Sequence, residues 1–363
     1  MFDYLKQWYN RKFSDPDAVT LFLLLLLTFA LIILFSDILA PILVALVLAY
    51  LLEWPVQRMV RAGLPRLSAV GIAFMSFVAL IVVLMLFLMP VIWQQSVALV
   101  AELPQMFAQV KVLLNRLPEM FPEYISQDNI NHFIQTTTDR ALLFGENLLS
   151  QSVSRIIGIM ALLIYLIIVP LLVFFMLKDK QQLLRHLNRI LPTNRRLIAQ
   201  VSDEMNMQIM NYIRGKAVEV FVVGVFTYLC FAFFDLRYAV LLAVLVGFSV
   251  LIPYIGAAVV TIPVFLVALF QFGWTGMFAW VMIVYLIIQA LDGNLLVPLL
   301  FSEVVNLNPV YIIGAVLVFG GIWGFWGVFF AIPLASLVKA VFTALSSKPE
   351  LPPTPTEPQQ ITD

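Results

Sequence analysis

The chain has 363 residues, of which 62% are hydrophobic and only 12% charged, and its formal net charge at pH 7 is zero. Soluble globular proteins are about half apolar and about a quarter charged, so this composition excludes a water-soluble fold and predicts an all-α polytopic membrane protein. The balanced charge gives no indication of a nucleic-acid partner, and the single cysteine, Cys230, excludes an intrachain disulfide framework or a CxxC metal site.

The chain opens with a predicted cytoplasmic lead-in, residues 1–17. Three basic residues precede the first apolar stretch, and no small-residue cleavage site follows that stretch directly. These features favour an uncleaved signal anchor over a secretory signal peptide.

Three transmembrane helices are predicted within residues 18–93. A helix needs about 20 mainly apolar residues to cross a bilayer, and the segments that approach this length are 18–35, 38–52 and 68–93. Ser36-Asp37 predicts a hinge between the first two segments. Glu53-Trp54-Pro55 ends the second segment, and we interpret it as an anchor at the membrane interface.

Residues 94–154 form a predicted extracytoplasmic region. Apolar residues recur there at helical spacing, and Pro104, Pro118 and Pro122 indicate turns. Together they predict short amphipathic helices that lie on the membrane or pack against a partner subunit. A small lid without a recognition role is the alternative. Residues 155–177 then predict a further transmembrane helix.

The distribution of Lys and Arg orients these segments, because basic residues are retained on the cytoplasmic side. Eight of them lie in the loop 178–216, whereas the region 94–154 has three against six acidic residues. We therefore expect both termini and the basic loop in the cytoplasm. Within that loop, residues 181–191 predict an interfacial helix attracted to anionic lipid, and the Pro-, Thr- and Gln-rich tail 346–363 predicts a disordered segment.

The predicted transport core, residues 217–345, contains an internal repeat. Ala243-Val244-Leu245-Val246 recurs as Ala315-Val316-Leu317-Val318, and each copy continues through an aromatic glycine motif to an Ile-Pro pair. Glycine and proline interrupt both copies. The residues expected to form hairpin turns or kinks, in the copies and between them, are Pro253, Gly256, Pro263, Gly293, Pro298, Gly324, Gly327 and Pro333.

Two topologies stay open for this core. Each copy is either one long kinked crossing, which gives eight spans, or a re-entrant hairpin, which gives six spans and an inverted repeat. Limbs of about 10–14 residues are too short to cross alone, and broken helices that meet near the midplane are typical of secondary transporters. We therefore favour the hairpins.

Polar residues lie between the two copies, where lipid makes them costly. Asp292, Gln289 and Asn294 fall within two helical turns, and a carboxylate at the centre of a membrane helix costs about 2.5–3.5 kcal/mol. We hypothesise that they bind a proton, a sodium ion or a polar solute. A network that only fixes helix packing is the alternative. Glu219 is a further candidate, for which an interfacial ion pair is the alternative.

The sequence contains no GxSxG, HExxH or Walker motif. Its two histidines, His132 and His186, lie in regions expected outside the membrane, without a recognisable nucleophile. We therefore expect no enzymatic activity, no metal site, and no cofactor beyond a coupling proton or sodium ion.

Six motifs are distributed over nearly the whole chain. They are Leu-Ala-Tyr-Leu-Leu-Glu-Trp-Pro at 48–55, Phe-Phe-Met-Leu-Lys-Asp-Lys at 174–180, Tyr-Ile-Arg-Gly-Lys at 212–216, Pro-Tyr-Ile-Gly-Ala at 253–257, Gln-Ala-Leu-Asp-Gly-Asn at 289–294, and Gly-Phe-Trp-Gly leading to Ile-Pro at 324–333. Together they resemble the autoinducer-2 exporter-like (AI-2E) family of bacterial membrane proteins, and within it the PerM-type permeases.

The resemblance implies a transporter of the bacterial cytoplasmic (inner) membrane that exports a small polar solute such as a signalling furanone. Related members are proposed to exchange sodium for protons. It also implies a homo-oligomer, with a pentamer as the suggested form.

The leading hypothesis is therefore a secondary transporter in which Asp292 carries the coupling charge between two broken-helix elements. A sodium/proton antiporter and a passive channel are alternatives that use the same site. A membrane scaffold or regulator, acting through region 94–154 or the basic loop, is an alternative from another class.

Overall fold

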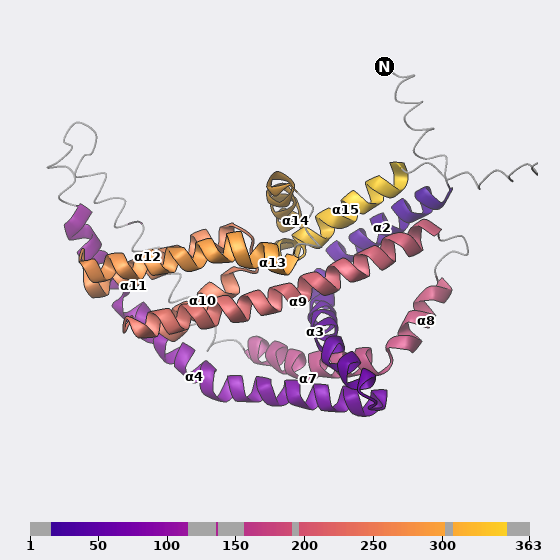
Figure 1. Ribbon diagram of the computed structural model, residues 1–363, viewed down its shortest axis with the longest axis horizontal. Coiled ribbons are helices and arrows are strands. Elements are labelled where there is room, and N and C mark those ends of the chain that lie inside the picture. Colours follow the sequence, from indigo (N-terminus) through magenta and orange to yellow (C-terminus); the bar gives the residue numbers. More distant parts are fainter. Residues whose placement is uncertain (1–15, 115–135, 137–155, 191–195, 302–307, 347–363) are drawn as a thin grey trace, which may run out of the picture.

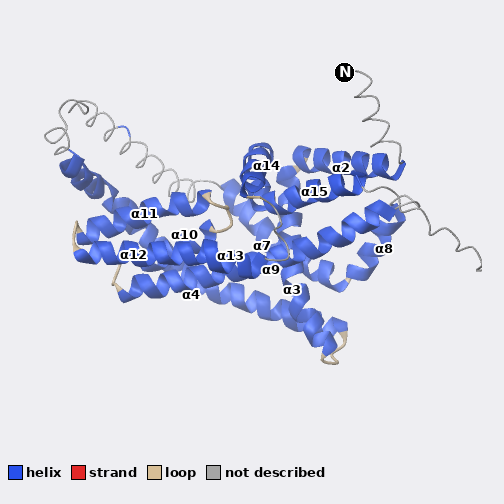
Figure 2. Cartoon of the chain, turned by 45° about the horizontal axis from the view of Figure 1, so that its top comes forward, coloured by secondary structure: helices blue, strands red, loops and turns tan. Residues whose placement is uncertain are grey.

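The computed structural model describes residues 16–114, 136, 156–190, 196–301 and 308–346, and all regular structure in these ranges is helical (Figures 1 and 2). Most of the predicted lead-in, the greater part of the outer region and nearly all of the tail lie outside the described residues. Within the described ranges, six helices are long and apolar enough to cross a bilayer. The predicted all-α polytopic membrane fold is thereby confirmed.

The first half of the chain forms helices α2 (Pro16–Leu34), α3 (Ser36–Arg61), α4 (Arg66–Leu114) and α7 (Ile156–Lys178). The break between α2 and α3 lies at Phe35, next to the hinge predicted at Ser36-Asp37. Helices α3, α4 and α7 share a core of small and β-branched residues, among them Ala45, Val70 and Val173. Small side chains let helices approach closely where lipid supplies no hydrophobic driving force between them.

Helix α4 is longer than the sequence predicts. It runs through Pro90 and Pro104 to Leu114 as one helix of 49 residues, so the turn predicted at Pro104 is wrong. Proline is tolerated inside membrane helices because neighbouring groups re-satisfy the backbone carbonyls that it leaves without a donor. The far part of α4 packs through Leu103 and Met106 against the core of the second half.

Helix α9 (Arg196–Phe233) is the axis of the second half. It follows the short basic helix α8 (Lys180–Ile190) and has 38 residues, which corresponds to about 57 Å. Helices from both halves of the chain contact it. Figure 1 shows α9 running through the middle of the molecule, with α10, α11 and α12 along one end and α2 and α15 along the other.

Helices α10 (Ala239–Ser249) and α11 (Ile255–Phe272) form what we call the first helix pair, and residues 250–254 are its turn, the first turn. Gln271, near the end of α11, joins the two ends of the pair that lie away from the turn, which we call its open ends. Its Oε1 accepts a hydrogen bond from the backbone N–H of Arg237 at 2.6 Å, and its Nε2 donates to the carbonyl of Asp235 at 2.7 Å. The pair therefore returns to the end of α9 from which it started.

Helix α12 (Gly276–Leu291) continues through a π-helix, η1 (Asp292–Leu296), into α13 (Val297–Phe301). Helices α14 (Pro309–Phe329) and α15 (Ala331–Ser346) form the second helix pair, and we call residues 324–330 the second turn. It begins at Gly324, which interrupts α14 with a φ of +59°. Figure 1 shows α14 at a steep angle to α15, and their buried contact lies near the turn, at Ala315, Val316 and Ala331.

The two turns share one close backbone approach. A Cβ atom on Gly256 would overlap the carbonyl oxygen of Ser249, and one on Gly327 would overlap the carbonyl oxygen of Phe319. Only glycine lets the chain at or directly after each turn lie this close to the first helix of the pair. The two glycine motifs that the sequence repeat aligns therefore occupy equivalent positions in the fold.

Candidate functional site

Both turns contact α9 within one helical turn of each other. Lys216 Nζ donates a hydrogen bond to the carbonyl of Val250 in the first turn at 2.7 Å. Tyr212 Oη donates to the carbonyl of Phe329 in the second turn, also at 2.7 Å. Because residues four apart lie on one face of a helix, the face of α9 that carries Tyr212 and Lys216 is where the two turns meet.

Apolar side chains from both turns close the same junction. Leu251 of the first turn and Phe329 and Phe330 of the second pack into one cluster with Tyr212 and Phe301. The rings of Phe329 and Phe330 are edge to face at 4.7 Å between centroids. The polar contacts at the junction are consequently shielded by aromatic side chains.

Lys216 and Glu219 form a buried ion pair beside this junction. Nζ lies 2.8 Å from Glu219 Oε2, and the two residues are only 5% and 1% exposed. A buried charge is costly unless it is paired and hydrogen-bonded. The sequence placed Lys216 in the basic loop and gave Glu219 an interfacial pair as its alternative, whereas here both charges are enclosed among packed helices.

The π-helix η1 places Asp292 at the same level as this ion pair. Helix α9 ends, and α12 begins, next to the first helix pair, at Phe233 and Gly276 respectively. Lys216 lies 17 residues before Phe233 and Asp292 lies 16 residues past Gly276, so each is about 25 Å from that end of its helix. Asp292 is half-buried and lies within electrostatic range of Lys216 and Glu219. Three charged groups from two chain segments are therefore brought together.

Local sequence explains the π-helix. Pro298 has no N–H, so it cannot donate to the carbonyl four residues earlier, and the N–H of Val297 bonds the carbonyl of Asp292 five residues back. The side chain of Asn294 donates to the carbonyl of Ala290 at 2.8 Å. Single-turn π-helices inside α-helices occur frequently at functional sites.

Three buried polar atoms at this level have no hydrogen-bond partner among the described residues: Asp292 Oδ1, Gln289 Nε2 and Glu219 Oε2. Of the three, Glu219 Oε2 still has the ion-pair contact with Lys216 Nζ at 2.8 Å. Asn294, by contrast, is exposed and turned back onto its own helix. Of the three residues grouped by the sequence, the structure thus directs Asp292 and Gln289 to the interior and leaves Asn294 outside.

The remaining predicted turn and kink residues are spread over the pairs. Pro263 lies within α11 and Pro333 within α15, in helices that continue past them. Gly293 has open space around the position that a Cβ would take. Among the described residues, none of these three contacts the Lys216–Glu219 pair.

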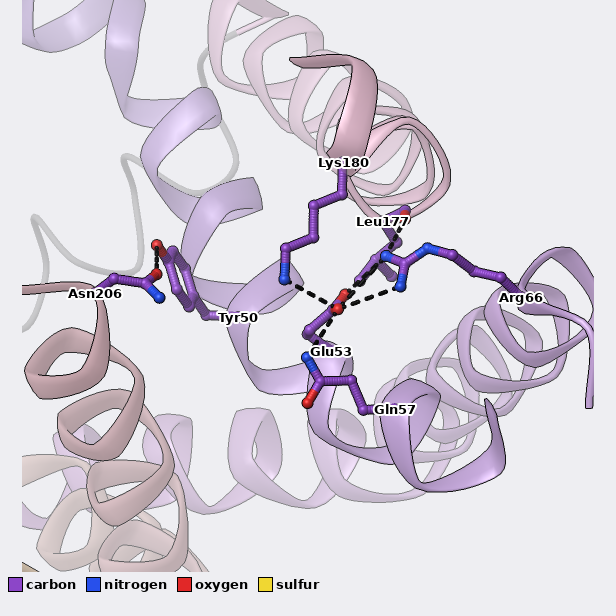
Figure 3. Close-up of polar contacts among 7 residues, drawn as sticks. All are labelled: Tyr50, Glu53, Gln57, Arg66, Leu177, Lys180 and Asn206. Atoms are coloured by element: carbon purple, nitrogen blue, oxygen red, sulfur yellow. Dashed lines mark hydrogen bonds and ion pairs between the residues drawn. The ribbon is translucent and has the colours of Figure 1, made fainter. Parts of the chain in front are cut away.

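A second buried carboxylate, Glu53, lies in the first half of the chain (Figure 3). Its oxygens contact Lys180 at 3.0 Å, Arg66 at 3.2 Å and Gln57 at 3.1 Å, and Arg66 also donates to the carbonyl of Leu177. The residue is 4% exposed and lies inside α3, not at its end. Glu53 therefore joins α3, α4, α7 and α8, which is more than the interface anchor that the sequence indicated.

The arrangement contains no group of three or more His, Cys, Asp or Glu side chains within the described residues that could hold a metal ion. What it does contain is one ammonium group and two carboxylates at a junction of broken helices. Such a site suits a proton or a monovalent cation, because one further positive charge would balance it.

Comparison with known proteins identifies the family. The model for the family described as "AI-2E family transporter" matches residues 21–347. The chain is also 51% identical over 344 residues to "Putative permease PerM" of Escherichia coli (strain K12), covering 95% of this chain and 98% of the relative. The chain belongs to the AI-2E transporter family.

Other AI-2E relatives are more distant. The chain is 27% identical over 317 residues to "Putative transport protein YueF" of Bacillus subtilis (strain 168), covering 86% of the chain and 85% of the relative. It is 25% identical over 309 residues to "AI-2 transport protein TqsA" of Escherichia coli (strain K12), covering 84% and 85%. The name of TqsA gives AI-2 as what that protein transports, whereas the name of PerM gives no substrate.

Family membership confirms the resemblance drawn from the six motifs, and it makes this chain a membrane permease of the AI-2E type. Sequence reasoning did not place Lys216 and Tyr212 in the site. A Lys and a Glu three residues apart at the start of an apolar run were the available signal for the pair. No pattern in the sequence indicated the contacts with the carbonyls of Val250 and Phe329, since these partners are distant along the chain.

Proposed function

We propose that this AI-2E protein is a secondary transporter that exports a small polar solute of the AI-2 type, coupled to a proton or a sodium ion. The observation that carries the proposal is the junction of the two turns on α9, next to the carboxylate of Asp292, whose Oδ1 has no hydrogen-bond partner among the described residues. Broken helices that meet at an ion site are the usual construction of secondary transporters. Asp292 is the coupling carboxylate, and Gln289 is its polar neighbour.

The first helix pair is a re-entrant hairpin in this proposal. Its helix α10 has only 11 residues, or about 16 Å, which is half the thickness of the hydrocarbon core. Gln271 also joins its two open ends. We extend the assignment to the second helix pair because it repeats the glycine contact of the turn. The six crossings of this proposal are then α2, α3, α4, α7, α9 and the run from α12 to α13, whereas α11 and α14, although long enough to cross, are limbs of the hairpins.

The charge distribution supports a location in the bacterial cytoplasmic membrane with both termini in the cytoplasm. The first helix pair then enters from outside and the second from inside, in an inverted arrangement. A cysteine introduced at exposed Trp274, beyond the end of the first pair, should react with an impermeant reagent in intact cells. Labelling only in inside-out vesicles would contradict this orientation.

Transport in proteoliposomes tests the function directly. With AI-2 as the solute, an imposed pH or sodium gradient should drive accumulation above equilibrium, and Asp292→Asn should reduce that accumulation at least about tenfold. Asp203→Asn, at an exposed position on α9, is the matched control and should transport normally. Unchanged coupled transport in Asp292→Asn would remove its assigned role.

The same assay separates the alternative functions. Sodium-driven proton movement without any solute would identify an antiporter, and solute flux that never exceeds equilibrium would identify a passive channel. Biological activity that survives Asp292→Asn but depends on the region 94–154 would indicate a scaffold or regulator.

We also propose that the protein is a homo-oligomer. Residues 82–87 of α4 are all exposed, from 45% at Leu84 to 73% at Phe87. Six consecutive residues point to every side of a helix, so this part of α4 lacks helix neighbours within the described chain. Cross-links between copies that carry a cysteine at Phe87, compared with Trp54 on α3 as a control position, would test whether α4 meets a second copy.

A further inference from the structure

The ammonium group of Lys216 joins three parts of the molecule. Besides the carbonyl of Val250 at 2.7 Å and Glu219 at 2.8 Å, it lies 5.4 Å from the centre of the Phe301 ring. Val250 belongs to the first turn, Phe301 to α13 and Glu219 to α9. One buried cation therefore holds the first turn onto α9.

The charges around Lys216 are unbalanced. The ionisable side chains that face it are Glu219 and Tyr212 on its own helix and Asp292 on η1. The first turn and α13 present a carbonyl and an aromatic ring. On α3, the buried carboxylate of Glu53 is paired with Arg66 and Lys180 and interacts with Arg214 of α9. One ammonium group thus interacts with two carboxylates, with Glu219 in an ion pair and with Asp292 at longer electrostatic range, in surroundings where charges interact strongly.

A second cation at this site would compete directly with Lys216. A proton on Glu219 removes the negative charge that lies 2.8 Å from the ammonium group, and a sodium ion bound between Glu219 and Asp292 competes with the ammonium group for that charge. Like charges in a buried site also repel each other. Lys216 would then leave the position from which it donates to Val250.

We propose that the coupling cation controls the first turn through Lys216, by displacing its ammonium group from Glu219 and thereby breaking its hydrogen bond to the carbonyl of Val250. This inference rests on the proposed function, because it assigns the regulation of the same ion site. Lys216 acts here as a positioning residue for the first turn. The second turn is not controlled by the cation, because the uncharged hydroxyl of Tyr212 holds it.

Cysteine labelling of the two turns tests this difference. In a Cys230→Ala background, Tyr254→Cys reports on the first turn and Phe325→Cys on the second, since these side chains are 57% and 53% exposed. The full chain in nanodiscs is labelled with an impermeant maleimide. One arm varies sodium against choline at constant ionic strength and pH, and the other varies pH without sodium, so the arms distinguish the two cations.

The expected result is an increase of about tenfold or more in the labelling rate of Tyr254→Cys when the cation binds, the factor that corresponds to the loss of one charged hydrogen bond. Phe325→Cys should not respond. In Lys216→Met/Glu219→Gln, the first turn should label rapidly at every ion concentration. The double variant removes both charges, because Lys216→Met alone leaves Glu219 buried and unpaired, which destabilises the fold.

Lys178→Met is the matched control, since Lys178 contacts the ring of Phe175 at the end of α7, and it should respond to cations as the wild type does. A cation response in the double variant equal to that of the wild type would overturn the proposal, as would a first turn that labels equally with and without either cation. If Asp292→Asn abolishes coupled transport while the first turn is insensitive, only this inference fails. If the turn responds but no solute or ion is transported, only the proposed function fails.

Discussion

At both turns a glycine lies against a backbone carbonyl, but the group that holds the first turn to α9 is a charged ammonium and the group that holds the second is a neutral hydroxyl. The helices behind the turns differ as well. In the first pair, hydrogen bonds of Gln271 hold together the ends of α10 and α11 that lie away from the turn. Helices α14 and α15, in contrast, diverge from their turn (Figure 1). Equivalent backbone geometry is thus combined with unlike side-chain contacts.

The difference between the two turns indicates which contact can respond to ions. A hydrogen bond from an ammonium group depends on every charge near it, whereas one from a buried phenol depends mainly on its own geometry.

Glu53 gives a second comparison, between a carboxylate whose charge is balanced and the carboxylates of the junction. Glu53 has two cations and an amide for its one carboxylate, so it has no unbalanced charge for an additional ion, while the junction on α9 has one cation for two carboxylates.

The largest effect is expected from filling the space at either turn. Gly256→Ala and Gly327→Ala each place a Cβ onto a backbone carbonyl, which should lower the free energy of unfolding by about 1–3 kcal/mol. Thermal unfolding of the purified protein, followed by tryptophan fluorescence, measures the loss. Gly276→Ala is the control, because its Cβ meets no neighbouring atom. If only one of the two variants is destabilised, the turns do not share the same packing.

The next largest effect is expected from the uncharged hydrogen bond of Tyr212 to the second turn. Tyr212→Phe leaves the buried carbonyl of Phe329 without its donor, which should cost about 1–2 kcal/mol. The same unfolding assay measures this cost, with Tyr228→Phe, at an exposed position on α9, as the control. Labelling of Phe325→Cys should accelerate equally at all sodium concentrations and pH values. A rate that depends on the cation would contradict the distinction between the two turns.

A smaller effect is expected at the open end of the first pair. Gln271→Ala removes two hydrogen bonds near the surface, and we expect a loss of about 1 kcal/mol. Hydrogen exchange should show faster exchange of the Arg237 amide, while Gln105→Ala on α4 leaves it unchanged. Protection that persists in Gln271→Ala would mean that helix packing alone keeps the pair closed.

The smallest effect is expected from the ion pair at the open end of the first helix pair. Arg237 and Glu102 are 3.4 Å apart with side chains 55% and 32% exposed, and exposed ion pairs contribute about 0–1 kcal/mol. Arg237→Gln should therefore change the melting temperature little, and less still at high salt. A large loss would show that charge matters at the open end as much as at the turn.

Much of the architecture could be predicted from residue type alone. The break beside Ser36-Asp37 follows from polar residues within an apolar run, and the two turns follow from glycine and proline motifs in equivalent places. Pro104 was misjudged because a proline marks a turn in water, whereas helix α4 continues through it where neighbouring groups satisfy the backbone. For the candidate site, Asp292 and Gln289 could be named because polar residues are rare in such segments.

By itself, the sequence determined that this protein is helical and lies in lipid, since no other solvent accommodates its composition. It also determined the break beside Ser36-Asp37 and the two glycine turns, although it did not distinguish these from prolines through which a helix continues, such as Pro104. Only the tertiary structure decided which atoms meet at those breaks. Lys216 lies 34 positions from Val250 and Tyr212 lies 117 from Phe329, and both contacts end on backbone carbonyls, which carry no residue identity. The control of a turn by a single ammonium group is therefore a property of the packed helices and is not visible in any segment of the chain.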